Sequence, residues 1–334
     1  MKKKVLLLFP QGIGDMIYTI DQFILNLNFS KNEYDFTFLV QYKQNSDLLK
    51  YFIKDAHLKI FYTPQKKIEY FKLLKLLIFK KYDYLIIDPN VNKFKASFFA
   101  ALINSKIKIF TYFFFHQLFF NYVLKEKNYS RHQKMYQLSQ ILNPSSPSKY
   151  NFKKFNLHNR FSKNQKETIL GIAPGSGTLE KHKRWPIEYF ANLANKIISE
   201  NKIDCIYIFG SVDENDLLTY LSDKIYLDKI LLFNKSIINS LEALINCDFL
   251  IANDNGMTHA AHCLKIKHIT IIGPTEPNQF VDKTQNNFVS LNLPCSPCYD
   301  RQRLGCGNEK CLKELNTNQV FEKINEIKKK NNIF

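Results

Sequence analysis

The chain has 334 residues, 45% of them hydrophobic, and a formal net charge of +17. This length exceeds one ordinary core and predicts two domains, and the apolar content excludes a disordered chain. The basic excess favours acidic partners (nucleic acid, an anionic membrane or phosphorylated ligands), unless it reflects only a compositional bias toward Lys, Asn, Ile and Phe.

Short apolar runs alternate with helical patterns through the first half of the chain. Strands are predicted over residues 5–9, 36–40, 58–61, 84–87 and 107–110. Helices are predicted over residues 15–27, 47–53, 68–79 and 96–103, where apolar residues recur at helical spacing.

A turn-rich segment over residues 143–148 has the composition of a linker between domains. The alternation then restarts, with strands predicted over residues 168–173, 203–209, 230–232, 249–252 and 268–272, and helices over 186–200 and 257–264. We therefore predict an N-terminal domain over 1–150 and a C-terminal domain over 165–316. A last helix over 317–334 is expected to pack back on the N-terminal domain.

Alternating strands and helices predict the α/β class, with parallel sheets covered by helices on both faces. Two such runs predict two Rossmann-like domains with parallel sheets facing a central cleft. In parallel sheets of this kind ligands bind beyond the carboxyl ends of the strands, so residues just after each strand are the candidates for function.

The first strand is followed by Gly12, Gly14 and Asp15. The glycines permit a tight turn, and Asp15 is expected at a helix N-terminus, where the dipole favours its ionised form. An ionised carboxylate there could accept a proton from an acceptor hydroxyl. The alternative is an aspartate that only caps the helix.

The first strand of the second domain ends in Gly175, Ser176, Gly177 and Thr178, and the basic run 181–184 follows. Backbone N–H groups of such a loop can cradle a diphosphate that the lysines neutralise. Neither the P-loop spacing nor the dinucleotide-binding glycine pattern is present. The alternative is a solvated loop with incidental charge.

A third cluster, residues 253–259, follows another predicted strand and opens a helix. Its helix N-terminus favours an anion, and Asp254 could accept hydrogen bonds from sugar hydroxyls. His259 is either part of this site or a packed core histidine.

These residues resemble glycosyltransferase family 9, the heptosyltransferases of lipopolysaccharide assembly. The resemblance covers nearly the whole chain and is carried by the segments 12–15, 173–176 with 183–186, and 253–259 with 273–275. It implies the GT-B architecture and an inverting transfer that needs no catalytic metal and no cofactor.

By this resemblance Asp15 is the general base, Lys183 neutralises the departing diphosphate, and Glu214 holds the donor ribose. The choice of Lys183 over Lys181 depends on its distance from the Trp-Pro pair at 185–186. The resemblance and the loop pattern together give a donor side of Gly175, Ser176, Gly177, Thr178, Arg184, Glu214, Asp254, Asn255, Gly256, Met257 and His259, and an acceptor side of Gly12 and Gly14.

Seven cysteines and a basic start whose apolar run is too short for a secretory signal favour a reducing compartment. Four cysteines cluster at Cys295, Cys298, Cys306 and Cys311. They are a weak candidate for a structural zinc site, because the spacing is not that of a standard zinc ribbon. Reduced structural thiols and local disulfides are the alternatives.

Residues 97–124 are unusually rich in phenylalanine but too often interrupted by polar residues to form a membrane span. This segment is either core or a surface that touches lipid.

The function expected is transfer of a heptose or related sugar from a nucleoside-diphosphate donor, ADP-heptose, to a lipopolysaccharide or lipooligosaccharide core acceptor. The enzyme is expected in the cytoplasm, peripherally bound to the anionic inner face of the membrane. The alternatives are a transferase of the same fold that uses another nucleotide sugar for capsule or O-chain glycans, a basic nucleic-acid-binding module, and a metal-dependent scaffold built on the late cysteines. No nucleic-acid partner is expected, because the lysines are spread along the chain.

Overall fold

The computed structural model describes residues 2–9, 12–27, 33–53, 58–64, 66–89, 91–111, 114–124, 130–144, 157, 167–277, 287–298 and 306–331. The chain divides into two compact units, Met1–Asn151 and Phe152–Phe334. Much of the predicted linker, residues 145–148, lies outside the described residues.

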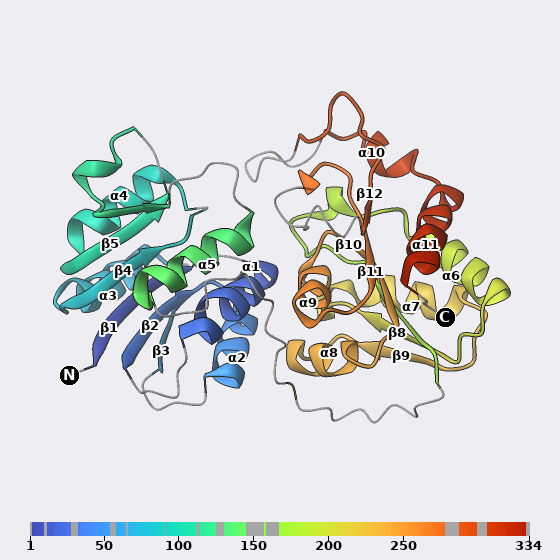
Figure 1. The fold of residues 1–334 in the computed structure, drawn as a ribbon, viewed down its shortest axis with the longest axis horizontal. Coiled ribbons are helices and arrows are strands. Elements are labelled where there is room, and N and C mark those ends of the chain that lie inside the picture. Colours follow the sequence, from blue (N-terminus) through green and yellow to red (C-terminus); the bar gives the residue numbers. More distant parts are fainter. Residues whose placement is uncertain are drawn as a thin grey trace. The chain divides into compact units, whose positions relative to one another are not determined.

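The N-terminal unit is built on a parallel sheet with helices on its faces (Figure 1). Its described strands are β1 (Lys3–Phe9), β2 (Tyr34–Val40), β3 (Leu58–Tyr62), β4 (Tyr82–Ile87), β5 (Ser105–Thr111) and β6 (Tyr122–Leu124). Its helices are α1 (Ile13–Tyr18), α2 (Lys43–Phe52), α3 (Lys67–Ile78), α4 (Lys93–Leu102) and α5 (Arg131–Leu142), with a short 3-10 turn, η4, at His116–Leu118. β1 is apolar along its centre because a parallel strand in the middle of a sheet is buried on both faces.

The predicted helix over 15–27 is not continuous. α1 passes into a π-helical stretch, η1 (Thr19–Ile24), and a 3-10 turn, η2 (Leu25–Leu27). Every residue of η1 is buried, and α5 packs against it, as the Thr19 hydroxyl contact with Met135 Sδ at 3.5 Å shows. The stretch therefore has no solvent face, although its apolar residues recur at ordinary helical spacing.

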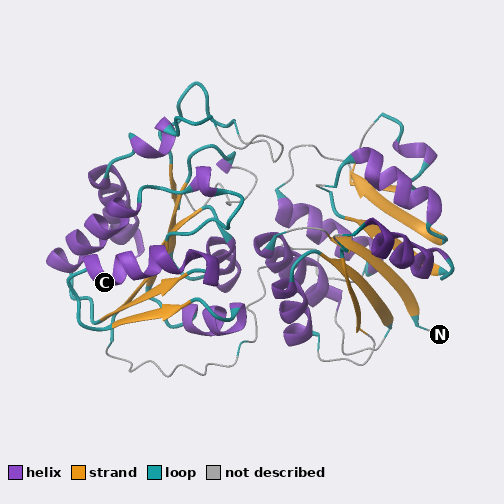
Figure 2. Ribbon diagram, turned by 180° about the vertical axis from the view of Figure 1, so that it is seen from behind, coloured by secondary structure: helices purple, strands orange, loops and turns teal. Residues whose placement is uncertain are grey.

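The C-terminal unit repeats the plan with a second parallel sheet. Its described strands are β7 (Ile169–Ala173), β8 (Cys205–Phe209), β9 (Ile230–Phe233), β10 (Phe249–Asn253), β11 (His268–Ile271) and β12 (Phe288–Val289). Its helices are α6 (Ile187–Glu200), α7 (Asn215–Lys224), α8 (Ile237–Leu244), α9 (Gly256–Leu264), α10 (Lys310–Lys313) and α11 (Thr317–Asn331), with 3-10 turns η5 (Lys181–Lys183) and η6 (Val212–Glu214). Figure 2 shows the strands of each unit enclosed by helices.

The last helix, α11, lies against α6 in the C-terminal unit (Figure 1). Val320, Phe321, Ile324 and Ile327 belong to the core of that unit. The Lys196 ammonium lies 4.5 Å from the centroid of the Phe321 ring. The apolar stripe of this helix thus completes the core under α6, and the expected packing on the N-terminal domain stays a prediction.

The two sheets have the same strand order, so the loops that follow β1 in the N-terminal unit and β7 in the C-terminal unit occupy equivalent positions. The sheets run β3-β2-β1-β4-β5-β6 and β9-β8-β7-β10-β11-β12, so each has its first strand beside its fourth. This is the doubly wound order, in which the chain reverses direction across the sheet between those two strands, and ligands bind at their carboxyl ends. The predicted α/β class and its two Rossmann-like units are confirmed, and the central cleft stays a prediction.

Candidate active site

Asp15 is the third residue of α1, directly after the first strand of the N-terminal sheet. Gly12 is the helix N-cap, with extended backbone and no side-chain capping bond. Asp15 is therefore not the capping residue, although it lies in the first turn, where the helix dipole favours a negative charge. Its side chain is buried, with a residue exposure of 8%. A Cβ at Gly12 would meet open space, and Gly14 is an ordinary residue of the first helical turn.

Arg131, the first residue of α5, joins Asp15 to Asp88, which directly follows β4. Its Nε lies 3.0 Å from Asp15 Oδ1. Its Nη1 donates to Asp88 Oδ1 at 3.1 Å, and its Nη2 pairs with Asp88 Oδ2. All three side chains are buried. Burial opposes the charge of Arg131, but the attraction of Asp15 and Asp88 outweighs it and raises the pKa of the guanidinium.

Sequence reasoning missed both Arg131 and Asp88 as members of this group. Asp88 stands at the end of β4, the neighbour of β1, so the rule on strand ends could have found it. Arg131 lies far along the chain in a mostly polar helix, and no local pattern connects it to Asp15.

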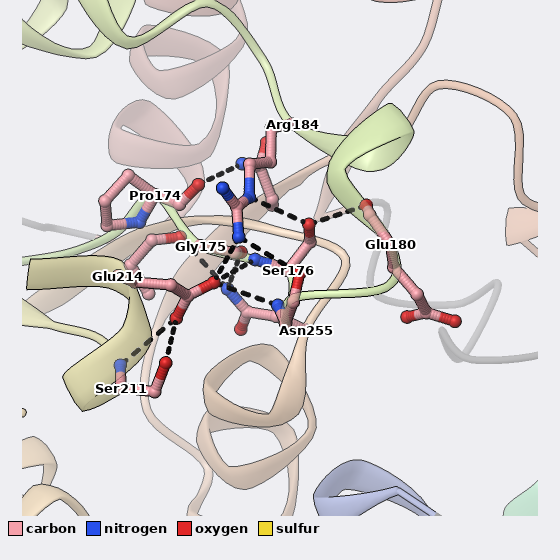
Figure 3. A network of polar contacts seen from close by, with 11 residues as sticks. Pro174, Gly175, Ser176, Glu180, Arg184, Ser211, Glu214 and Asn255 are labelled. Atoms are coloured by element: carbon pink, nitrogen blue, oxygen red, sulfur yellow. Dashed lines mark hydrogen bonds and ion pairs between the residues drawn. The ribbon is translucent and has the colours of Figure 1, made fainter. Parts of the chain in front are cut away.

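In the C-terminal unit Glu214 organises the loop after β7 (Figure 3). Its Oε1 accepts from the backbone N–H groups of Ser176 and Gly177, both at 2.9 Å, and from Arg184 Nη2 at 2.8 Å. Its Oε2 accepts from the backbone N–H and the hydroxyl of Ser211, at 3.1 and 3.0 Å. A carboxylate offers about four acceptor positions, so these bonds engage both oxygens of Glu214 fully.

The loop therefore differs from the cradle that the sequence predicted. The N–H groups of Ser176 and Gly177, expected to face a diphosphate, donate to Glu214 within the chain. Gly175 has no room for a side chain, because a Cβ there would collide with the Glu214 carboxylate. Gly177 has φ +84°, a left-handed conformation that favours glycine, and Thr178 is exposed on the turn.

Asn255 connects this loop to α9. Its Oδ1 accepts from the N–H groups of Met257 and Thr258, at 2.9 and 3.2 Å, and so caps the helix. Its Nδ2 donates to the carbonyls of Ala173 and Gly175, at 3.0 and 2.8 Å. The ends of β7 and β10 are held together at this point, with Gly256 as the first residue of the helix.

Asn253 and Trp185 set the position of the basic run. Asn253 Nδ2 donates to the Pro174 carbonyl at 2.6 Å, and Asn253 Oδ1 accepts from the Trp185 N–H at 3.1 Å. The Trp185 side chain is fully buried and donates from Nε1 to the Leu315 carbonyl at 2.7 Å. Since Trp185 is fixed at both ends, the residues just before it are fixed as well.

Because Trp185 is fixed, Lys183 lies against Asp254 at the end of β10. Its Nζ lies 3.3 Å from Asp254 Oδ2 and 3.1 Å from Glu180 Oε2, and the residue is buried. Lys181 is exposed. His259 Nε2 lies 3.7 Å from Asp254 Oδ1, so His259 faces the same carboxylate and is not a core histidine away from the site. A buried cation and a carboxylate thus face each other beside the ends of β7 and β10, at the edge of the sheet where ligands bind in this fold.

The late cysteines give no metal centre among the described residues, where no group of three or more His, Cys, Asp or Glu could hold an ion. Residues 299–305, within the cluster, lie outside the described part. Cys295, Cys298 and Cys306 are exposed free thiols, and Cys311 is buried, which raises its pKa to about 11. The loop packs on the turn after β11, because Cys298 N–H donates to the Pro274 carbonyl at 2.9 Å.

The chain matches the family described as "Glycosyltransferase family 9 (heptosyltransferase)" over residues 70–307. It is 32% identical over 165 residues to a lipooligosaccharide heptosyltransferase 2 of Campylobacter jejuni subsp. jejuni serotype O:6, covering 48% of this chain and 51% of that protein. It is 27% identical over 177 residues to lipopolysaccharide heptosyltransferase 2 of Escherichia coli K12, covering 51% and 49%. The chain thus matches about half the length of these curated relatives.

Two solved structures share the fold over nearly their whole length. The E. coli ADP-heptose LPS heptosyltransferase II superposes with a TM-score of 0.68 at 18% identity, covering 99% of this chain and 100% of that one. A family 9 glycosyltransferase from Veillonella parvula gives a TM-score of 0.70 at 17% identity, with 97% of each chain covered. Because the family match spans most of the sequence, this chain belongs to glycosyltransferase family 9, the heptosyltransferase family.

Proposed function

We propose that this protein is an inverting glycosyltransferase that moves a heptose from ADP-heptose to the core saccharide of a lipopolysaccharide or lipooligosaccharide. The names of three matches support the donor and acceptor: the E. coli structure is named for ADP-heptose, and the two curated relatives are named for lipooligosaccharide and lipopolysaccharide. The observation that carries the proposal is the buried Lys183–Asp254 pair at the ligand-binding edge of the C-terminal sheet of a family 9 chain.

On the donor side, Lys183 supplies the cation for the diphosphate. Its ammonium is held between Asp254 and Glu180 at the edge of the sheet where ligands bind. Negative charge grows on the diphosphate as the sugar leaves, and a cation already in place stabilises that charge without reorganisation. Asp254 and His259 together offer an acceptor and a ring nitrogen for the hydroxyls of the sugar.

On the acceptor side, Asp15 is the general base. Arg131 keeps it paired and in a fixed orientation. In the transfer, the acceptor hydroxyl gives its proton to the Asp15 carboxylate, and its oxygen forms a bond to the anomeric carbon. The bond from that carbon to the diphosphate oxygen breaks, and its electron pair leaves with the nucleotide. Because the acceptor attacks the face opposite the diphosphate, the configuration inverts.

For Glu214 we propose a structural role in addition to the ribose contact that the resemblance implies. Its Oε1 accepts bonds from the loop after β7 and its Oε2 accepts bonds from Ser211 after β8, so we assign it to holding these two loops together. Arg184 assists, because its Nε donates to the Ser176 hydroxyl at 3.2 Å and its Nη2 to the Gly177 carbonyl at 3.0 Å.

Because the proposed acceptor is linked to lipid, we propose a cytoplasmic protein that binds the inner leaflet of the membrane peripherally. The net charge of +17 supports attraction to anionic lipid. Among the described helices, none has both the length and the apolar character needed to cross a membrane. The reaction as proposed needs the nucleotide sugar as substrate and no cofactor.

A screen of the purified protein against ADP-, GDP- and UDP-sugars tests the donor. We expect ADP-heptose to raise the melting temperature, and ADP-heptose alone to support transfer to a heptose-deficient core. Lys183→Ala should lower turnover by about 10²–10³-fold and weaken donor binding. Lys181→Ala is the matched control and should behave as wild type, because Lys181 is exposed.

Preference for another nucleotide sugar would support a transferase for capsule or O-chain glycans. A gel shift with random oligonucleotides tests the alternative that the protein binds nucleic acid. Specific nucleic-acid binding without any sugar transfer would contradict the proposal.

A further inference from the structure

The N-terminal unit exposes many large apolar side chains on one side of its sheet. α3 and α4 both bury one face in the same core cluster, and the rings of Tyr70 and Phe99 meet there at 6.1 Å between centroids. The two helices are therefore neighbours on that side. Their outer faces carry Ile68, Phe71, Leu76 and Phe79 on α3 and just after it, and Phe94, Phe98 and Leu102 on α4.

The exposed residues of α3 form a continuous stripe. Ile68, Phe71 and Phe79 follow one another at spacings that return to the same side of a helix, whereas Leu73 and Leu77 point into the core. Phe71 is 68% exposed and Phe79 is 79% exposed. When a helix buries one apolar face in the core and exposes a second apolar face to solvent, the exposed face is a candidate surface for contact with a protein or a membrane.

The outer face of α4 continues this pattern. Phe94, at 87% exposure, and Phe98 are one helical turn apart, while Ala96 and Phe99 face the core. The connection from β5 to β6 adds Phe114, Phe115 and Leu118, all exposed. It is joined to the same core by Phe119.

Lysines are interleaved with these apolar residues. Lys72 and Lys75 lie among the exposed residues of α3, and Lys93 and Lys95 flank Phe94 on α4. Across both helices the sequence has five lysines and a single acid, Glu69. Aromatic rings combined with lysines fit an interface where apolar groups enter the acyl boundary and ammonium groups meet anionic headgroups.

We propose that the outer face of α3, α4 and the residues 114–118, named here the aromatic face, docks on an anionic lipid surface. The inference uses the proposed function only in taking lipid as the occupant, and its own support is the mixed aromatic and basic surface. The charge pattern disfavours a second copy of this chain as occupant, because two such faces would bring their lysines together.

Vesicle flotation tests the aromatic face. The wild-type chain and the triple variant Phe71→Ser, Phe79→Ser, Phe94→Ser are mixed with phosphatidylcholine vesicles with or without phosphatidylglycerol. We expect the wild type to bind only the anionic vesicles, and the triple variant to lose affinity by about tenfold or more. Substitution of these exposed side chains should leave the melting temperature unchanged.

Matched controls come from the C-terminal unit. Tyr226→Ser removes an aromatic side chain of similar exposure, 81%, and should bind vesicles as wild type does. Lys72→Gln with Lys75→Gln should weaken binding, whereas Lys202→Gln with Lys224→Gln should weaken it much less. Equal binding to vesicles by the triple variant and the wild type would overturn the proposal. It would also be overturned if sedimentation equilibrium showed a dimer for the wild type and the control variants but a monomer for the triple variant.

A transfer assay separates this inference from the proposed function. The triple variant should keep wild-type turnover on a delipidated, water-soluble core acceptor and lose it on acceptor embedded in vesicles. If the wild type transfers no sugar but floats with anionic vesicles through these phenylalanines, the function fails and the membrane face stands. If it transfers sugar to both acceptors and never floats, the face fails and the function stands.

Discussion

Arg131 holds two buried carboxylates, Asp15 and Asp88, through a single guanidinium. A buried ion pair adds little net stability, because desolvation of the charges offsets their attraction, but removal of one partner leaves an uncompensated charge in the interior. Arginine suits this position because its planar fork can bond two carboxylates in fixed directions. Asp15 is thereby held in one orientation.

Arg131→Gln should lower the free energy of unfolding by about 3–5 kcal/mol, since Asp15 and Asp88 would lose their counter-ion. Urea denaturation followed by circular dichroism measures this. Adding Asp88→Asn to the variant should restore part of the loss. A change smaller than about 1 kcal/mol, the usual value of an exposed ion pair, would mean that the triad is solvated.

Glu214 fixes the shape of the loop after β7 through its hydrogen bonds to Ser176 and Gly177. Glu214→Gln keeps the size of the side chain but replaces one acceptor oxygen with a donor, which opposes the N–H groups of Ser176 and Gly177 or of Ser211. We expect donor affinity to fall by about tenfold, corresponding to one misplaced charged hydrogen bond. Calorimetric titration with ADP measures it, with Asp213→Asn as the neighbouring control. Unchanged ADP affinity would argue against this role.

At the scale of elements, β11 contains a buried neutral histidine. His268 Nδ1 donates to the Ile266 carbonyl at 2.8 Å, and its Nε2 accepts from Asn287 Nδ2 at 2.7 Å. Burial lowers the pKa of His268 to about 4, well below its ordinary value of 6.5. Both hydrogen bonds as arranged fit the neutral ring, so the fold of this strand is coupled to pH.

The sign of that coupling follows from proton counting. Between pH 6.5 and 4 the unfolded chain binds a proton at His268 and the folded chain does not, so stability from this group is complete above pH 6.5 and falls with decreasing pH. The loss is about 3 kcal/mol over that range. His268→Gln should flatten the pH dependence of the urea midpoint, and His116→Gln should not. An identical pH profile in wild type and His268→Gln would contradict the assignment.

Most elements could be predicted because long apolar runs and helical spacing decide them locally. β6, β12, α5 and α10 were not predicted. β6, β12 and α10 have only three, two and four residues, and α5 buries the polar Arg131 and Ser139 on the same face as its apolar residues. The π-helical stretch after α1 was read as an ordinary helix because its packing against α5 is a tertiary effect. The ends of elements shifted for the same reason, with α2 beginning at Lys43.

At the scale of the whole molecule, the sequence could predict which loops follow the strands of each sheet, and strand ends in doubly wound sheets are where ligands bind. It could not predict contacts across many residues. Arg131 reaches Asp15 and Asp88 from another helix, and Glu214 closes on a loop 37 residues earlier. The Lys183 assignment could be predicted only from its distance to Trp185, and the burial of that tryptophan explains why the spacing matters.

In the proposed transfer, Asp15 takes the proton of the acceptor hydroxyl and Lys183 neutralises the diphosphate. The most direct measurement is mass spectrometry of a heptose-deficient core acceptor incubated with ADP-heptose and either wild type or Asp15→Asn. We predict that the wild type adds one heptose, and that Asp15→Asn binds ADP normally but transfers about 10²–10⁴-fold more slowly. Wild-type turnover by Asp15→Asn, or no mass increase with the wild type, would contradict the account.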